Sequence, residues 1–211
     1  MSEKRIEIRP INPIQMRVTI AGDGDLVLNR MDDVTARALT DARKDKAKST
    51  DKPNVWESVI TAMHWRDPLP KDPLERAEWN ENTLAEFLRS NAPCIPAFGL
   101  RKSWGDAVVR NEIDKYATKF MTQVNIIESL IPIKFTQHFV DEKLMSPKRG
   151  APVLARLNRF TGWHATFTVN YTDNVYSDEQ ILNIINMAGF GLGIGSGRSS
   201  GYGRYHVENV S

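Results

Sequence analysis

Residues 189–205 read Gly-Phe-Gly-Leu-Gly-Ile-Gly-Ser-Gly-Arg-Ser-Ser-Gly-Tyr-Gly-Arg-Tyr, with glycine at every second position of the first half. Glycine loses more backbone entropy on folding than any other residue, so a run this dense needs a reason. The usual reasons are backbone with positive φ, close approach of another backbone, or contact with phosphate. A flexible linker is a poor explanation, because large apolar residues (Phe190, Leu192 and Ile194) alternate with the glycines.

Two common nucleotide-binding loops do not fit this run. A P-loop has the pattern G-x-x-x-x-G-K-[ST] between a strand and a helix, and the run contains no lysine and no following helix. A dinucleotide-binding loop opens a helix with G-x-G-x-x-G, and no frame of the run supplies that spacing. What remains is a purely structural turn, or a loop that approaches phosphate or a neighbouring backbone.

The segments on either side of the run have clear local patterns. Ser177 and Gln180 form a capping box that predicts a helix with apolar residues on one side, leading into the run. Residues 204–210 follow it as a short strand. Residues 163–171 alternate apolar and polar side chains, which is typical of a half-buried strand, and residues 14–20 do the same.

The rest of the chain completes a recognisable order. We predict a helix capped by Asp32 or Asp33, and mainly helical structure over residues 98–120. Further expectations, from N- to C-terminus, are a lysine-rich mobile loop over 43–53, a helix over 73–88, a strand over 125–135 and a loop over 139–149. With residues of about 40–95 set aside as an insertion, the order is strand, helix, strand, strand, helix, strand. The sequence therefore predicts an α+β fold: one RRM-like domain over residues 1–211, with a ferredoxin-like βαββαβ antiparallel sheet and a largely helical insertion.

Charge is more informative in its distribution than in its total, since the formal net charge is only +2. No Asp or Glu occurs from Lys143 to Thr172, and this stretch suits a track of phosphates. Its candidate contacts are Lys148, Arg149, Arg156 and Arg159, and Arg101 and Lys102 add charge near a predicted helix start. Phe160, Trp163 and Tyr176 would offer planes for base stacking, although a core position is the favoured interpretation of Trp163.

Composition and spacing exclude several other classes. The single cysteine, Cys94, excludes an internal disulfide framework and a cysteine-rich zinc site, and suits a small buried residue. The metal-ligand spacings H-x-x-x-H, H-E-x-x-H and C-x-x-C are absent, and we expect neither a metal nor a cofactor. No apolar stretch reaches the length of a membrane span and no signal peptide is visible, so we expect a cytoplasmic protein without membrane contact.

The C-terminal pattern of helix, glycine run and final strand resembles the glycine-rich loop of the RAMP superfamily, the RRM-like proteins of CRISPR effector complexes. The likeness is strongest over residues 193–205. Residues 156–205 also look like the C-terminal half of small phage-encoded proteins, and residues 18–30 loosely resemble the first strand and loop of RAMP backbone subunits. The matched parts cover about half of the chain, and the insertion has no counterpart in them.

The resemblance implies a function for the glycine run. It implies an RRM-like protein that binds single-stranded RNA or DNA, RNA favoured, through sugar and phosphate, as an effector subunit or a phage or mobile-element homologue. Its partners would be the nucleic acid and copies of itself or other effector subunits. Arg198 and Arg204 would make the charged contacts at the loop, with Gly195, Gly197, Gly201 and Gly203 allowing close approach.

Two alternatives stay open. The first is a metal-independent endoribonuclease of the same superfamily, with His64, His138, His164 and His206 as candidates for general acid–base chemistry. A surface histidine is the simpler interpretation of each, so we assign no catalytic residue. The second alternative is a protein-binding phage inhibitor or assembly module, in which Trp56, Trp65 and Trp79 of the insertion would anchor a partner.

Overall fold

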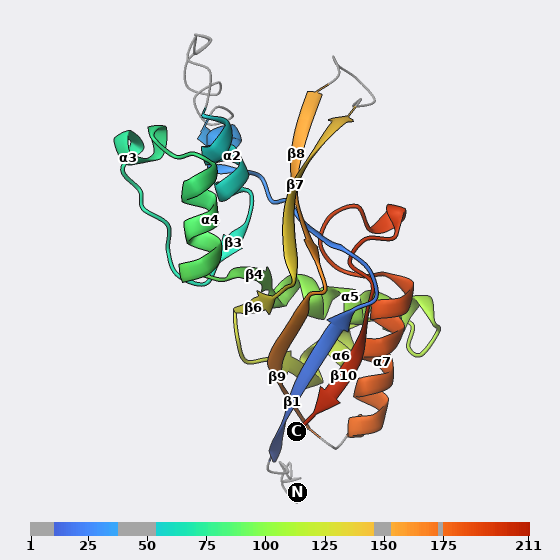
Figure 1. Ribbon diagram of the computed structural model, residues 1–211. Helices are drawn as coiled ribbons and strands as arrows, with labels where there is room; N and C mark the ends of the chain where they lie inside the picture. Colours follow the sequence, from blue (N-terminus) through green and yellow to red (C-terminus); the bar gives the residue numbers. More distant parts are fainter. Residues whose placement is uncertain (1–10, 38–53, 146–152, 173–174) are drawn as a thin grey trace, which may run out of the picture.

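The fold is organised around strand β1 (Pro13–Gly22), in a computed structural model that describes residues 11–37, 54–145, 153–172 and 175–211 (Figure 1). Met16, Val18 and Ile20 are buried beneath the helices, and the residues between them point to the opposite face. β1 pairs antiparallel with β9 (His164–Thr172) on one side and with β10 (Tyr205–Val210) on the other. The first and last thirds of the chain thus share one sheet.

The main sheet has the strand order β10-β1-β9-β6-β4-β3, and β5 (Val124–Ile126) also pairs with β9. β1 and β6 (Leu130–Lys134) lie on either side of β9, which is the split βαβ arrangement of ferredoxin-like folds. Helices α5 (Ala97–Arg110) and α7 (Asp178–Gly191) pack against each other and against this sheet (Figure 1). The predicted ferredoxin-like α+β fold is therefore confirmed.

A second sheet, β2-β8-β7, stands beside the first. β7 (Gln137–Met145) and β8 (Val153–Thr161) form a long hairpin, and β2 (Leu26–Leu28) pairs with β8. The predicted loop over 139–149 is wrong for 139–145, whereas residues 146–152 lie outside the described residues. The many charges in this stretch suggested a loop, but several of them form ion pairs across the hairpin.

The largely helical insertion contains α2 (Val55–Thr61), β3 (His64–Trp65), α3 (Pro73–Ala77), α4 (Glu81–Ser90) and β4 (Pro93–Pro96). Residues 33–37 are helical, and Asp32 accepts a hydrogen bond from the Thr35 N–H, as a cap does. The predicted start of the insertion near residue 40 and the whole lysine-rich segment over 43–53 lie outside the described residues.

Three predicted elements are divided in the structure. The helix expected over 73–88 is two helices, because the Asn80 side chain accepts from the backbone N–H groups of residues 82 and 83 and starts α4 anew. The helical region 98–120 becomes α5 and α6 (Thr118–Gln123), and the strand 125–135 becomes β5 and β6.

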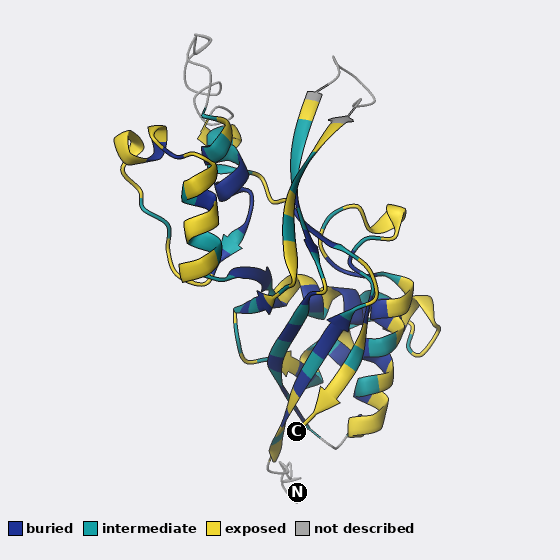
Figure 2. Ribbon diagram, viewed as in Figure 1, coloured by how far each residue is buried: buried dark blue, intermediate teal, exposed yellow. Residues whose placement is uncertain are grey.

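Most of the large aromatic residues belong to the core (Figure 2). Phe160 and Trp163 have no exposed surface, and Tyr176 is 8% exposed, so none of the three is available for base stacking. Trp65 and Trp79 are also buried, and Trp56 packs partly buried against the core. Trp65 and Trp79 therefore cannot be surface anchors for a partner, whereas Trp56 keeps part of its surface exposed.

Candidate functional site

The glycine-rich run forms a loop with positive φ at five positions: Gly193, Gly195, Gly197, Gly201 and Gly203. A Cβ on Gly195 would lie 2.5 Å from the Val27 carbonyl oxygen, so this position requires glycine for space as well as for conformation. The neighbouring Ser196 N–H donates to the same Val27 oxygen at 2.8 Å. The loop is therefore fastened to the segment around β2.

The next turn presents Arg198 to solvent. Gly197 and Gly201, both left-handed, flank a single 3-10 turn, η1 (Arg198–Ser200). The backbone N–H groups of Gly197, Arg198 and Ser199 donate to no other described residue. Successive free N–H groups of this kind form a concave anion-binding surface. The loop therefore combines unpaired donors with an exposed arginine.

A cavity of about 570 Å³, here called the loop pocket, lies against this turn. Its charged lining residues are Asp106 and Arg110 of α5 together with Arg198 and Arg204. Lys102 forms an ion pair with Asp106 at 3.3 Å, while no ion pair joins the three arginines to any described residue. The pocket is therefore strongly cationic.

Arg204 is the least satisfied of these arginines. Its Nη1 atom is buried and has no hydrogen-bond partner among the described residues. A buried charged donor without a partner costs free energy comparable to a lost hydrogen bond, or more. An oxygen of an anionic ligand in the loop pocket would remove that cost.

Two further cavities adjoin the loop pocket in series, each sharing lining residues with the next. The central pocket, of about 320 Å³, shares Asp106, Gly195, Ser196 and Arg198 with the loop pocket. The outer pocket, of about 380 Å³, shares Arg30, Met63 and His64 with the central one. We call these three pockets together the basic groove.

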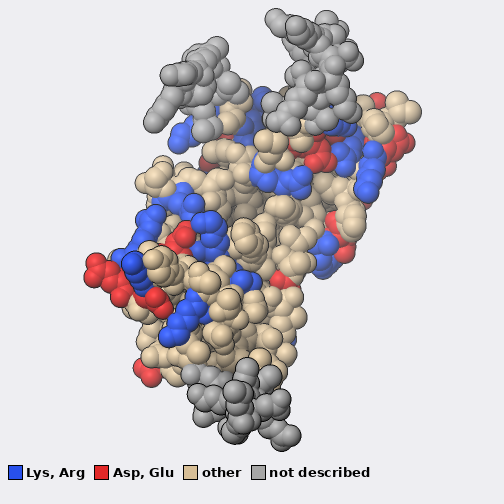
Figure 3. All heavy atoms as spheres, turned by 180° about the vertical axis from the view of Figure 1, so that it is seen from behind, with Lys and Arg blue, Asp and Glu red and all other residues tan. Residues whose placement is uncertain are grey.

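The groove is basic along its length. Its lining cations are Arg30, Arg66, Lys71, Arg76, Lys102, Arg110, Arg198 and Arg204, and its acids are Asp33, Asp67 and Asp106. Figure 3 shows Lys and Arg side chains at several places on the face of the molecule that it displays, with Asp and Glu side chains beside some of them. Asp33 and Asp67 each form an ion pair with an arginine. The lining of each pocket therefore has no net negative charge.

Several of these groove residues were not foreseen from the sequence. Asp106 and Arg110 were missed, although they follow the predicted Lys102 at intervals of four residues, and this spacing places all three on one stripe of a helix. That signal was available before the fold was known. Arg30, Arg66 and Lys71 come from segments with no charge pattern of their own, and only the tertiary fold brings them to the groove.

The predicted site residues Arg101 and Lys102 lie on different sides of α5. Lys102 lines the central pocket, as described above. Arg101 points elsewhere: its guanidinium donates to the Asn125 side chain at 2.6 Å and to the Met121 carbonyl at 2.9 Å. It ties α5 to α6 and β5.

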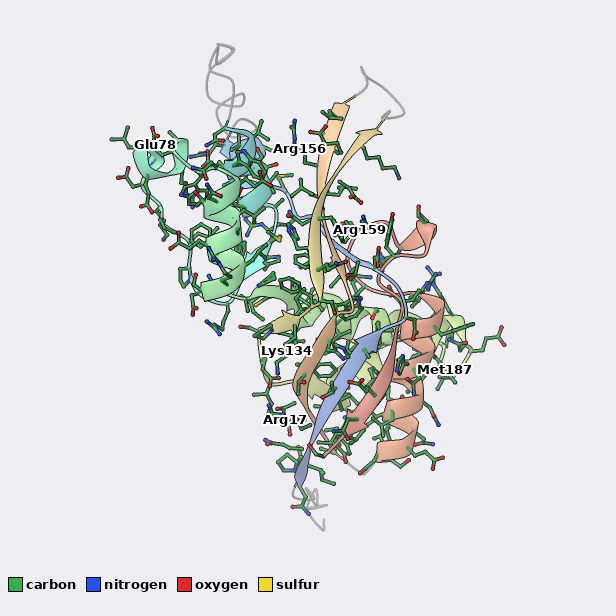
Figure 4. All side chains as sticks on the ribbon, in the orientation of Figure 1. Arg17, Glu78, Lys134, Arg156, Arg159 and Met187 are labelled. Carbon is green, nitrogen blue, oxygen red and sulfur yellow. The ribbon has the colours of Figure 1, made fainter. Side chains whose placement is uncertain are left out.

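Arg156 and Arg159 lie on β8 (Figure 4), and neither lines any of the three pockets of the groove. Arg156 pairs with Glu142 across the hairpin at 2.9 Å. Arg159 lies between Asp25 and Asp141, at 2.6 and 2.5 Å, and its guanidinium is 4.7 Å from the centre of the Phe139 ring. The structure therefore gives both arginines intramolecular partners. The other two members of the predicted basic track, Lys148 and Arg149, lie outside the described residues.

The four histidines are not brought together. His164 contacts Glu208 at 3.1 Å and His206 contacts Asp23 at 2.6 Å, both at the exposed face of the sheet. His138 contacts Asn158 at 3.0 Å in the second sheet. His64 alone of the four lines the groove, where burial and then the neighbouring Arg30 lower its pKa.

Cys94 lines the central pocket, but its thiol has low nucleophilic reactivity. Burial raises the pKa of its thiol to about 11, so the thiolate form is scarce at neutral pH. Among the described residues there is no cluster of three or more His, Cys, Asp or Glu side chains that suits a metal ion. No helix in the described segments combines the length and the apolar character of a membrane span.

The open face of the main sheet is a second surface to consider. Its outward positions on β1 and β9 are mostly polar, and the hydroxyls of Thr19 and Thr166 lie 3.0 Å apart. Arg17 and Lys134 also come from strands of this sheet (Figure 4). The outward positions of β1 and β9 carry no Phe, Tyr or Trp, so they lack the stacking platforms with which RRM sheets bind bases. The basic groove is therefore the stronger candidate.

Comparison with known protein families gave no match, and neither did comparison with curated proteins. Among solved structures, the chain is similar to one in the "Cryo-EM structure of the Type III-B Cmr-beta bound to cognate target RNA", with 11% sequence identity and a TM-score of 0.49. The similarity covers 94% of this chain and 60% of that chain. The fold assignment rests on the strand order described above.

Proposed function

We propose that this protein binds single-stranded nucleic acid, RNA in preference to DNA, through the sugar-phosphate backbone in the basic groove. The observation that carries the proposal is the loop pocket, where the buried Nη1 of Arg204 has no partner among the described residues. Arg110 and Arg198 line the same pocket. Phosphate oxygens are the natural acceptors for such a set of guanidinium and backbone N–H donors.

The form of the groove supports a strand rather than an isolated anion. Cations recur through three adjoining cavities, as a phosphate track requires. The resemblance to RAMP proteins at residues 193–205 leads us to propose RNA as the preferred strand. It also leads us to propose a place as a CRISPR-type effector subunit or as a phage or mobile-element homologue, with copies of itself or other subunits as partners.

A salt titration of strand binding tests this function. Fluorescence anisotropy of a labelled single-stranded RNA should give an affinity that falls steeply with salt, because bound phosphates release counterions. Arg198→Ala and Arg204→Ala should each weaken binding and reduce the slope of log K against log salt by about 0.7, the value expected for one lost contact on a single strand. Absence of binding at low salt would exclude the proposal.

Arg89→Ala is the matched control for that titration. Arg89 is exposed on α4, and its Nε donates to the Ala85 carbonyl of the same helix. It lines none of the three pockets of the groove. The control removes the same net charge, so it should leave both the affinity and the salt slope close to those of the unchanged protein. An equal loss in the control would mean that net charge alone governs binding.

A further inference from the structure

The central pocket differs from the loop pocket in having an apolar floor. Met63, Ile95, Leu100 and Ile194 line it, and none of them is more than 3% exposed. Phosphate gains nothing from such a surface, because it would lose hydration there without finding a donor. The floor therefore calls for an apolar or aromatic group on the ligand. The volume of about 320 Å³ lies at the lower end of the range for small-molecule sites.

Two polar side chains of the pocket have unused hydrogen-bonding capacity. The imidazole of His64 and the exposed carboxamide of Asn29 make no hydrogen bond to any described residue, which leaves both free to bond a ligand. His64 is partly buried, and its lowered pKa keeps the ring neutral at neutral pH. A neutral imidazole and a carboxamide each offer a donor and an acceptor. They match the mixed donor and acceptor edge of a planar heterocycle.

Cations outnumber acids in the lining of the pocket. Arg30, Lys102 and Arg198 line it together with Asp106, which pairs with Lys102, and Arg198 is shared with the loop pocket. The three parts of the pocket thus correspond to three features of a nucleotide: an apolar floor for the faces of the base, an unpaired polar pair for the edge of the base, and cations for the phosphate. A free anion or an aliphatic side chain would use only one of these parts.

We propose that the central pocket takes one nucleobase of the bound strand, so that the protein senses the base at one position while it holds the backbone elsewhere. This inference rests on the proposed strand binding and adds base recognition to it. Because the outward positions of β1 and β9 carry no Phe, Tyr or Trp, the pocket replaces stacking on the sheet as the place of base contact.

Gly99 offers a way to close the pocket without disturbing the fold. It lies in the first turn of α5 and lines the pocket, and a Cβ at this position would meet no atom within 4 Å. A leucine here is favourable for the helix and extends into free space. Gly99→Leu should therefore fill the pocket while the protein stays folded, which a thermal melt would verify.

The experiment compares strands with and without bases at one low salt concentration. The strands are RNA homopolymers of A, C and U and an abasic ribose-phosphate strand of equal length, each measured by fluorescence anisotropy. The unchanged protein should bind its preferred homopolymer about tenfold more tightly than the abasic strand, the size of one base-stacking contact. Gly99→Leu should abolish that difference. Ala77→Leu, which adds the same side chain at an exposed position of α3, should retain it.

Each outcome separates this inference from the function on which it rests. Salt-dependent binding of all strands with equal affinity would overturn the base pocket and leave backbone binding in place. A preference that survives in Gly99→Leu would place base contact elsewhere. Failure of every strand to bind would overturn both proposals. If Gly99→Leu does not fold, Asn29→Ala replaces it, and an unchanged ranking of the homopolymers in that variant would count against the pocket.

Discussion

Arginine has opposite roles at two positions of this molecule. Arg159 has two carboxylate partners and an aromatic ring, and hydrogen bonds to Asp141 and then Asp25 raise its pKa. Arg204 has a buried nitrogen and no ion-pair partner among the described residues. A residue that stabilises the fold is satisfied within the fold, whereas one kept for a ligand is satisfied only in the complex.

The two arginines should therefore respond differently to removal. Arg159→Ala should lower the free energy of unfolding by up to about 1 kcal/mol, because its ion pairs are partly exposed to solvent. Arg204→Ala should leave this free energy unchanged or raise it, because the variant no longer buries an unpaired donor. Urea denaturation of both variants measures the difference. A larger loss for Arg204→Ala than for Arg159→Ala would assign Arg204 a structural role.

The glycine-rich loop should be sensitive at Gly195 and tolerant at Gly191. Gly195 has a φ of +74° and no room for a Cβ beside Val27, so Gly195→Ala should destabilise the protein by about 2 kcal/mol. Gly191 lies at the end of α7, and a Cβ added there would meet no atom within 4 Å. Gly191→Ala should be neutral or slightly stabilising. Equal denaturation midpoints for the two variants would contradict this account.

Single residues were predictable from the sequence where local chemistry decides their position. Arg198 and Arg204 stand within a glycine pattern that restricts the backbone, and the structure places both at the loop pocket. Trp163 is buried, as the favoured core interpretation has it, but Phe160 was predicted to offer a stacking plane and is wholly buried as well, since β2 and β7 pair on either side of it. Exposure of an aromatic ring depends on distant strands, which the local pattern does not contain.

Among the helices and strands, the β7–β8 hairpin is joined to the insertion by one buried amide. Asn158 on β8 has no exposed surface; its Nδ2 donates to the Val59 carbonyl of α2 at 2.9 Å, and its Oδ1 lies 3.0 Å from the His138 Nε2. Burial lowers the pKa of His138, although Asn158 and Asp141 oppose that shift. The neutral imidazole can donate to the amide oxygen.

This arrangement predicts a loss of stability in acid. The unfolded chain binds a proton at His138 with the ordinary pKa of 6.5, and the folded protein binds it less readily. The contribution of His138 to the free energy of unfolding is therefore fully present above pH 6.5, and it is lost as the pH falls through the pKa of the folded state. Thermal melts between about pH 7 and pH 5 should show a falling midpoint. In His138→Gln the midpoint should fall less with acid, because the contribution of His138 to the pH dependence is gone. His64→Gln should likewise remove the contribution of His64, whose pKa is also lowered.

Helix and strand boundaries were predictable where a cap or an alternating pattern marks them. The capping box at Ser177 and Gln180 starts α7, and the alternation of β9 gives the expected burial. The hairpin strand β7 was not predicted, because its charged residues are satisfied only by β8 and its neighbours. Charge indicates a loop only when no partner strand is present.

In the molecule as a whole, the basic groove joins parts of the chain that are far apart in sequence. Arg30 follows β2, His64 belongs to the insertion, Lys102 to α5 and Arg198 to the glycine-rich loop. The strand order was predictable from the alternation of helices and strands. The groove was not, because its insertion side has no sequence pattern that indicates a ligand.

A bound strand should therefore stabilise the sheet and the insertion together. At a free strand concentration of one hundred times Kd, binding adds about 2.7 kcal/mol to the free energy of unfolding. Differential scanning calorimetry should show one transition that moves to higher temperature with added RNA. The variant Arg198→Ala/Arg204→Ala should show a much smaller shift. Separate transitions, with only one of them moved by RNA, would mean that the strand contacts one side of the groove.

The position of β1 in the sheet also has a consequence for synthesis on the ribosome. β1 begins at Pro13, but its two neighbours, β9 and β10, begin at His164 and Tyr205. At translation rates of about 5–20 residues per second, β1 waits roughly 8–30 s before its first neighbour is made. During that time its apolar residues and both of its edges lack their native cover. The nascent chain should therefore be a substrate for chaperones until the C-terminal third has emerged.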